Sequence, residues 1–212
     1  MVPLIDKACE LGVKRFCIDD GWAEQGVWQP LDENFGSGGL KKIIEYIIKK
    51  GMIPGLWFEF ERTQYKVAEM VGAKDFILRR DGLDIAEHRP KLNFRCKEAV
   101  DYLLRAVDAV YKMGVRYIKN DHNNAEYVGT QTDAESPAEG LRQNEAAFYG
   151  FILKLNELYP YLVIENCGSG ALRSDNGTLK HFSLQSTSDQ EDYRLYPSIA
   201  VGSLALMPPE KA

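Results

Sequence analysis

The chain has 212 residues, 45% of them hydrophobic and 27% charged, and its formal net charge at pH 7 is −5. This length allows one sizeable hydrophobic core, and a negative charge without any basic run argues against nucleic acid as a partner. No apolar run approaches the ~20 residues that cross a bilayer, and the N-terminus lacks a signal-peptide pattern, so we expect a cytoplasmic protein with no membrane partner.

Helical hydrophobic spacing alternates along the chain with short apolar runs that are typical of strands. We predict helices over 2–12, 39–50, 64–72, 96–113, 141–158 and 191–202, the last with a break at Pro197. We predict strands over 15–19, 52–59, 115–121, 161–166, 182–187 and 203–207. Between them we predict loops over 23–37 and 124–140 and from the strand over 161–166 to Leu179, a turn at Asp81-Gly82 and an extended piece near Leu92.

This alternation, without Asn-Gly hairpins, favours a parallel sheet. Polar residues follow five of the strands, which favours a (β/α)8 barrel of the TIM type over an open sheet with one switch point. A complete barrel needs about 250 residues, whereas this chain starts inside a helix and offers about six strands. We therefore predict an incomplete α/β barrel that lacks its first and last strands and forms one catalytic domain over 1–212.

The strand over 115–121 ends in a cluster of polar residues. Strand alternation places Lys119 and Asp121 on one face and Asn120 on the other. In a parallel α/β protein, catalytic groups lie at this end of the strands. The alternative interpretation is a structural ion pair near a strand end.

Two other strand ends combine carboxylates with tryptophan. Asp19 and Asp20 form a pair beside Trp22, and adjacent anions need donors such as sugar hydroxyls or a metal. Trp57 and Glu59 share one face of the next strand. Aromatic rings beside carboxylates suit sugars, but core packing is the commoner use of tryptophan, and the aspartate pair is also suited to capping a loop.

Asp121 and Asp189 each follow a strand and are expected to face the same site. Glycoside cleavage with retention needs two carboxyl groups about 5–5.5 Å apart, one nucleophilic and one that donates a proton. We expect Lys119 to lower the pKa of Asp121, and the surroundings of Asp189 to raise its pKa.

The remaining motifs give weaker indications. The segment 167–171 is suited to an anion-binding nest, but it lacks the Gly-Lys-Ser/Thr ending of a phosphate loop. The histidines are His88, His122 and His181, without HExxH or HxH spacing. The cysteines are Cys9, Cys17, Cys96 and Cys167, without CxxC spacing. These spacings predict a reducing compartment and no zinc site.

Taken together, the motifs resemble those of the α-galactosidase-like glycoside hydrolases of family 36. The matching segments, in chain order, are Asp19-Asp20-Gly21-Trp22 (DDGW in the family), Gly55-Leu56-Trp57-Phe58-Glu59 (GLWxEPE), Arg89 before Leu92-Asn93-Phe94, Lys119-Asn120-Asp121 (KWD), Cys167 to Arg173 (CxSGGGR) and Ser188-Asp189-Gln190-Glu191-Asp192 (SDxxD). The departures are Phe60 for proline, Asn120 for tryptophan, and Ala171 and Leu172 for two glycines.

The resemblance implies a retaining exo-glycosidase that acts on terminal α-galactosides through a covalent glycosyl-enzyme intermediate. It implies that Asp121 is the nucleophile and Asp189 the acid/base, and that no cofactor is needed. The residues expected to bind the galactoside are Asp19, Asp20, Trp22, Trp57, Arg89, Lys119, Asn123, Cys167, Gly168, Ser169, Arg173 and Asp192.

Three alternatives stay open. The family has a β-sandwich before the barrel and further chain after it, so this chain resembles the middle of a catalytic domain. The first alternative is therefore an inactive fragment. Open barrel edges would then favour a homo-oligomer. A non-catalytic sugar-binding module is the second alternative, and a metal-dependent hydrolase built on Asp19, Asp20 and His122 is the third.

Overall fold

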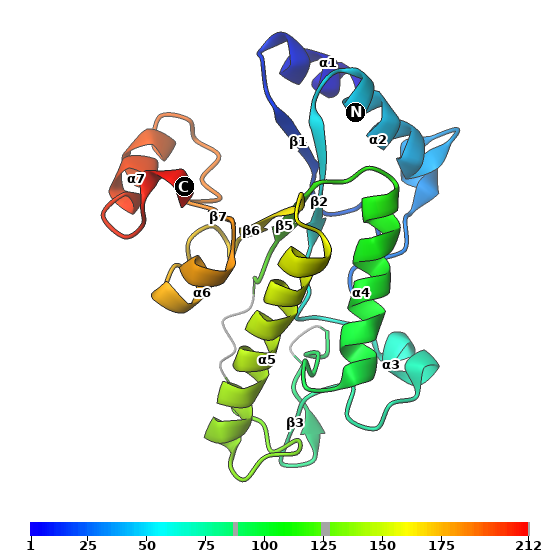
Figure 1. The fold of residues 1–212 in the computed structure, drawn as a ribbon, viewed down its shortest axis with the longest axis vertical. Coiled ribbons are helices and arrows are strands. Elements are labelled where there is room, and N and C mark those ends of the chain that lie inside the picture. The colour runs from blue at the N-terminus through cyan, green and yellow to red at the C-terminus, as the bar shows by residue number, and fades with distance from the viewer. Residues whose placement is uncertain (87–88, 124–127, 212) are drawn as a thin grey trace.

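A computed structural model of the chain describes residues 1–86, 89–123 and 128–211. Within these residues, five strands form one parallel sheet in the order β1-β2-β5-β6-β7 (Figure 1). The strands are β1 (Arg15–Ile18), β2 (Ile53–Phe58), β5 (Tyr117–Asn120), β6 (Val163–Asn166) and β7 (Leu184–Gln185). Neighbours in the sheet follow one another along the chain and run parallel, which is the topology of an incomplete (β/α) barrel, as predicted.

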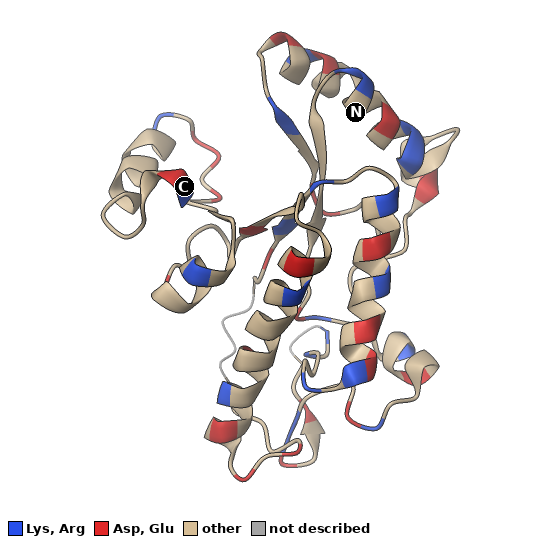
Figure 2. Ribbon diagram, in the orientation of Figure 1, with Lys and Arg blue, Asp and Glu red and all other residues tan. Residues whose placement is uncertain are grey.

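The helices alternate with these strands. They are α1 (Val2–Glu10), α2 (Gly39–Lys49), α3 (Tyr65–Val71), α4 (Lys97–Lys112), α5 (Pro137–Leu158), α6 (Asn176–His181) and α7 (Tyr196–Ser203), with short 3-10 turns η1 (Asp32–Phe35) and η2 (Pro209–Lys211). Acidic and basic residues are interspersed along α1 to α5, whereas α7 carries neither (Figure 2). Across the described ranges, every helix is too short or too polar to cross a lipid bilayer.

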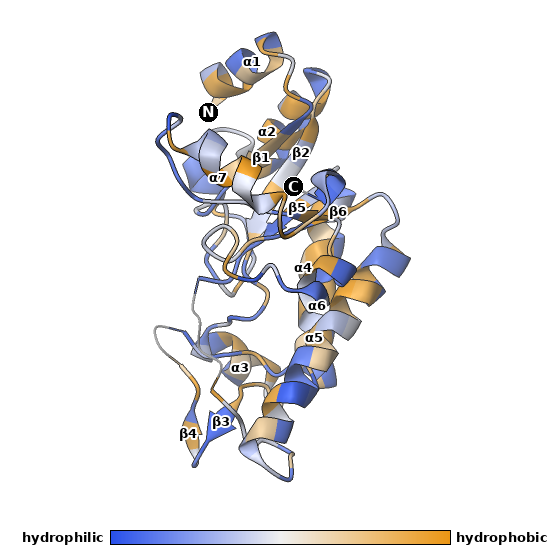
Figure 3. Ribbon diagram, turned by 90° about the vertical axis from the view of Figure 1, so that its left-hand side faces the viewer, coloured by the Kyte–Doolittle hydropathy of each residue, from blue (hydrophilic) through white to orange (hydrophobic). Residues whose placement is uncertain are grey.

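Strand alternation divides the sheet into two faces. On the outer face, Leu56, Phe58, Ile118 and Ile164 are fully buried and share one core with the buried residues of α2, α4 and α5. Each such side chain contributes about 1.5–3 kcal/mol to folding when it leaves water. Figure 3 shows apolar and polar segments alternating along α4 and α5, as helices with one buried face require.

The inner face is different. Tyr117 and Glu165 are only partly buried, and they line a cavity of about 490 Å³ that β7 and α7 close on the other side. The Tyr117 hydroxyl donates a hydrogen bond to Glu165 Oε2 across the strands. Asp121 and Asp189 do not line this cavity, which therefore lies beside the candidate site.

Three helices differ from the prediction. Helix α5 begins at Pro137, four residues before the predicted start, because the Ser136 hydroxyl caps it by accepting a hydrogen bond from Glu139 N at 3.2 Å. Helix α6 lies in the segment predicted as a loop, and the Asp175 carboxylate caps it. Helices α1 to α4 agree with the predicted ones to within two residues, whereas α7 begins at Tyr196, five residues after the predicted start.

The C-terminal prediction was wrong. Residues 203–207, predicted as a last strand, form the end of α7 and the turns after it. Pro197 lies in the first turn of α7, where its missing N–H is not needed, and so it does not break the helix. Apolar runs of this length suit a buried strand and a buried helix equally well.

The turn at Asp81-Gly82 is confirmed, and it joins a small antiparallel hairpin of β3 (Arg79–Arg80) and β4 (Leu83–Asp84). Both turn residues have positive φ, 51° and 77°, which is the conformation that an Asp-Gly pair favours. The extended piece near Leu92 pairs with Ile77 in an isolated bridge. Residues 124–127 of the predicted loop and His88 lie outside the described residues.

Candidate active site

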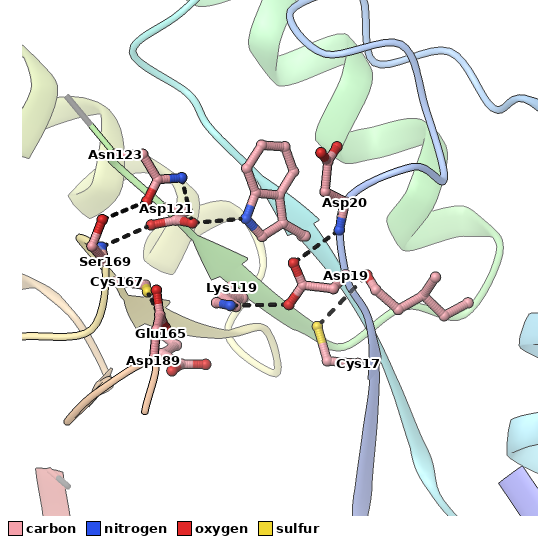
Figure 4. Close-up of polar contacts among 12 residues, drawn as sticks. Cys17, Asp19, Asp20, Lys119, Asp121, Asn123, Glu165, Cys167, Ser169 and Asp189 are labelled. Atoms are coloured by element: carbon pink, nitrogen blue, oxygen red, sulfur yellow. Dashed lines mark hydrogen bonds and ion pairs between the residues drawn. The ribbon is translucent and has the colours of Figure 1, made fainter. Parts of the chain in front are cut away.

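The predicted site residues follow the carboxyl ends of the parallel strands (Figure 4). Asp19 and Asp20 follow β1, Asp121 follows β5, Cys167 follows β6, and Asp189 lies four residues beyond β7. Because the strands are parallel and in register, these ends meet at one edge of the sheet.

Asp121 is almost completely buried, and several hydrogen-bond donors surround its carboxylate. Trp57 Nε1 and Asn123 Nδ2 donate to Oδ2 at 3.1 and 2.8 Å, while the backbone N–H groups of His122 and Ser169 lie 2.8 and 3.4 Å from Oδ1. Burial by itself would raise the pKa of Asp121, but the hydrogen bonds, that from Trp57 first, hold it below its ordinary value. Asp121 is therefore an oriented, ionised carboxylate.

Lys119 lies beside Asp121 but binds a different carboxylate. Its Nζ is 2.9 Å from Asp19 Oδ2. Burial would lower the pKa of Lys119, but the bond to Asp19 raises it above its ordinary value, so the ammonium stays charged. The lowered pKa of Asp121 thus depends mainly on neutral donors, whereas the sequence suggested Lys119 as its cause.

Cys167 connects the two candidate catalytic carboxyl groups. Its Sγ lies 4.0 Å from Asp189 Oδ1 and also hydrogen-bonds Asp121. Burial, together with the charge of Asp121, raises the pKa of the Cys167 thiol to about 12. Cys167 is therefore a protonated thiol between an ionised carboxylate and the exposed Asp189.

The loop after β6 joins the two sides of the site. The Ser169 hydroxyl donates to Asn123 Oδ1 at 2.9 Å, and Ser169 has a positive φ of 44°. Gly170, with φ 87°, packs directly on Ser188, so that a Cβ at Gly170 would lie 2.5 Å from Ser188 Cα. Gly168 is buried beside the His122 carbonyl. The loop therefore touches both the segment that carries Asp121 and the one that carries Asp189.

Two of the predicted sugar-binding residues are enclosed by protein. Trp22 is 1% exposed, donates from Nε1 to the Trp57 carbonyl at 2.6 Å, and packs on the Phe58 ring. Arg173 is 5% exposed, and its Nη1 lies 2.7 Å from Glu61 Oε2. Both side chains therefore bind protein groups in this structure, and the sugar contact predicted for them stays a prediction.

Three other predicted residues differ in their surroundings. Asp20 is exposed and accepts a hydrogen bond from Gln25 Nε2 at 2.5 Å. Arg89 pairs with the buried Glu59 through Nη2, while its Nη1 has no hydrogen-bond partner among the described residues. Asp192 is bound on both oxygens by Arg194, beside the chain that leads into α7.

Two departures from the family motifs meet in the structure. Asn120 is fully buried on the outer face, and its Oδ1 accepts a hydrogen bond from Phe60 N at 3.1 Å. A proline at position 60 would have no N–H, so the Phe60 N–H and the Asn120 amide form one coupled pair. This contact was not predicted, although the two departures lie at the ends of adjacent strands.

The set proposed for a metal-dependent hydrolase is not assembled. His122 is buried, and its Nδ1 lies 3.1 Å from Glu61 Oε2, whereas Asp19 binds Lys119. In the part of the chain that the structure describes, no group of three or more His, Cys, Asp or Glu residues is arranged to hold a metal ion.

Comparison with known proteins gives one consistent result. A family model described as Melibiase matches residues 1–211. An α-galactosidase of Escherichia coli is 29% identical over 223 residues, which cover 99% of this chain and 30% of that protein. The α-galactosidase Mel36A of Lactobacillus acidophilus is 27% identical over 187 residues, covering 82% of this chain and 25% of that protein.

Solved structures share the fold. The GH36 α-galactosidase AgaA from Geobacillus stearothermophilus superposes with a TM-score of 0.83 at 21% identity, over 98% of this chain and 30% of that one. An α-galactosidase from Lactobacillus brevis gives a TM-score of 0.81 at 24% identity, over 95% and 29%. The chain thus spans about 30% of the length of the relatives it matches.

Proposed function

The chain belongs to the melibiase family of GH36 α-galactosidases, as its motifs predicted, and from this premise we propose that it hydrolyses terminal α-galactosides with retention of configuration. The relative in Escherichia coli is named an α-galactosidase, and variants of AgaA have been crystallised with raffinose and with stachyose. The observation that carries the proposal is the ionised Asp121, linked through Cys167 to Asp189.

In the proposed reaction, an oxygen of Asp121 attacks the anomeric carbon while Asp189 donates its proton to the leaving oxygen. The sugar is then bound covalently to Asp121. Asp189, now ionised, takes a proton from water, the water oxygen attacks the anomeric carbon, and Asp121 is released as a carboxylate. No cofactor takes part in this scheme.

Several groups are proposed to bind the sugar. The Asp19–Lys119 pair and Asp20 offer acceptors and a cation beside β1, and Asn123 and Ser169 offer an amide and a hydroxyl on the other side of Asp121. Sugar hydroxyls act both as donors and as acceptors, so a mixed set of this kind suits them. We place Trp57, Arg89 and the buried Cys167-Gly168 segment around the same sugar.

The test is the turnover of an aryl α-galactoside by the wild-type chain and by the isosteric variants Asp121→Asn and Asp189→Asn. Loss of the nucleophile is expected to lower kcat on the order of 10⁴-fold or more, and loss of the acid/base about 10²–10⁴-fold. Asp81→Asn, in the distant hairpin, is the matched control. Turnover by Asp121→Asn equal to that of the wild type would refute the nucleophile assignment.

The stereochemistry gives a second readout. Proton NMR during the first turnovers should show α-galactose as the first product, whereas β-galactose would refute retention.

The open inner face and the exposed Asp189 favour a second candidate, a chain that binds galactose without cleaving it. Calorimetry with galactose separates the two functions, because the binding module predicts an affinity that Asp189→Asn does not change and no turnover by either chain. A homo-oligomer through the edge strands β1 and β7 is a further proposal, and a sizing column tests it.

A further inference from the structure

A buried charge cluster lies next to the candidate site without forming part of it. Glu61, three residues beyond β2, is 1% exposed, and its Oε2 lies 2.7 Å from Arg173 Nη1 and 3.1 Å from His122 Nδ1. Burial by itself would raise the pKa of Glu61, but Arg173, His122 and Lys91 hold it well below its ordinary range. Glu61 is therefore an ionised carboxylate in the protein interior.

Stability alone is a weak reason for such a group. Bringing a carboxylate and a guanidinium out of water costs several kcal/mol per ion, and well-packed apolar residues often stabilise a core as well or better. The contacts of the two partners indicate what else Glu61 does.

His122 connects Glu61 to Asp121. The His122 imidazole contacts Glu61, and the His122 backbone N–H donates to Asp121 Oδ1 at 2.8 Å. The orientation of one residue thus depends on the charge cluster on one side and fixes the candidate nucleophile on the other.

Arg173 connects Glu61 to the loop after β6. The Arg173 carbonyl accepts a hydrogen bond from Asn166 Nδ2 at 2.5 Å, so the two ends of this loop are tied together. Its tip, Ser169, reaches Asp121, and Gly170 packs on Ser188, the neighbour of Asp189. Fixing Arg173 therefore fixes the base of the loop that touches both carboxyl segments.

We propose that Glu61 is a positioning residue, which holds the segment of Asp121 and the loop of residues 167–173 in one arrangement through His122 and Arg173. This inference rests on the proposed function for the roles of Asp121 and Asp189. It concerns a residue that contacts neither of them directly among the described residues. Glu61 stands at the last position of the GLWxEPE motif, but the sequence analysis assigned it no role.

The first test needs no catalysis. Amide hydrogen exchange is compared among the wild type, Glu61→Gln and the control Glu45→Gln, which removes the same charge from an exposed pair with Lys41 on α2. In Glu61→Gln, exchange should rise at least about tenfold at residues 121–123 and 167–173 and stay unchanged in β1 and α2, because only the local tether is lost. Glu45→Gln should resemble the wild type throughout.

Two results would overturn the proposal: unchanged exchange in both segments, or an equal rise across the whole chain, which would mean that Glu61 only stabilises the fold. Should Glu61→Gln not fold, Arg173→Lys serves in its place. Arg173→Lys keeps the positive charge but replaces the planar guanidinium, which can bind two partners at once, with an ammonium group. The rise in amide exchange is then expected at residues 167–173.

The second test separates this inference from the proposed function. If the wild type cleaves an aryl α-galactoside, Glu61→Gln should lower kcat on the order of 10- to 100-fold with little change in KM, since misplaced groups act mainly on the reacting geometry. The double variant with Arg173→Lys should be no worse than the poorer single one, and additive losses would contradict action through Arg173. If the wild type shows no turnover, the proposed function fails, while the exchange experiment still decides the role of Glu61.

Discussion

The two faces of the same strands differ in what they contribute. Ile118, on the outer face of β5, is fully buried against the helices, whereas its neighbours Tyr117 and Lys119, on the inner face, are only partly buried and bind Glu165 and Asp19. Because successive side chains of a strand point to opposite faces, alternate residues of β5 contribute to the hydrophobic core and to the candidate site. A substitution at one position should change stability, and a substitution at the next should change the site.

The strongest test of this separation compares neighbours on β5. Ile118→Ala should lower the free energy of unfolding by about 2–5 kcal/mol, because it leaves a cavity in the core. Tyr117→Phe removes one partly exposed hydroxyl and should cost about 0.5–1.5 kcal/mol. Urea unfolding measures both values, and equal losses would show that the two faces are not distinct in energy.

Asn120 is the exception that sharpens the comparison, since it is a polar residue on the outer face. Asn120→Ala would leave the buried Phe60 N–H without its acceptor and should cost about 1–3 kcal/mol. Asn34→Ala is the control, because Asn34 also bonds a backbone group but is exposed, and it should cost less than about 0.5 kcal/mol. A similar small loss for both variants would mean that the Phe60 N–H finds another acceptor.

The smallest effect distinguishes the buried Glu61 from the partly buried Glu165 by the sign of the pH dependence of stability. The pKa of Glu61 is lowered in the folded protein, so its stabilisation is present above about pH 4.5 and is lost as the pH falls through its folded value. Burial raises the pKa of Glu165, so stability falls as the pH rises from about 4.5 through its folded value. Each group contributes at most about 1.4 kcal/mol per pH unit.

Urea unfolding between about pH 3 and pH 8 measures these slopes. Glu165→Gln should be more stable than the wild type at neutral pH, because it removes the cost of ionising that side chain. In Glu61→Gln, the free energy of unfolding should fall less steeply with decreasing pH than it does in the wild type. If the two residues contribute slopes of opposite sign to the free energy of unfolding against pH, Glu61 is stabilised as an anion and Glu165 is not. Slopes of the same sign would contradict the pKa directions.

The parallel order of the sheet could be predicted from the sequence because helical and strand periods alternate cleanly from Leu40 to Ile164. The α5 start at Pro137 also carried a signal, since Ser136 and Glu139 form the pattern of a helix cap. Helix α6 has only six residues, too few to display a period. The apolar run before Met207 fits either state, and only the packing of α7 decides it.

The sequence could predict which residues make up the candidate site, but not which of them are buried. Motif order brought Asp121, Asp189 and Cys167 to one edge of the sheet, because parallel strands end together. Sequence alone could not show that Trp22 and Arg173 are enclosed, since burial depends on the segments that pack over them. The sequence analysis assigned no role to Glu61 for the same reason, because its partners lie 61 and 112 positions further along the chain.

Gly170 has a consequence for engineering. Its missing side chain lets the loop after β6 lie against Ser188, where an added methyl group would be 2.5 Å from a backbone carbon, well inside the 3.4 Å at which ordinary contact begins. Any larger residue would act as a wedge between the proposed nucleophile and proton donor. Wider spacing of the two carboxyl groups, about 6.5–9.5 Å, is what lets a water molecule attack the sugar directly. A larger residue at this one position is therefore where a designer would begin to test the proposed retaining mechanism.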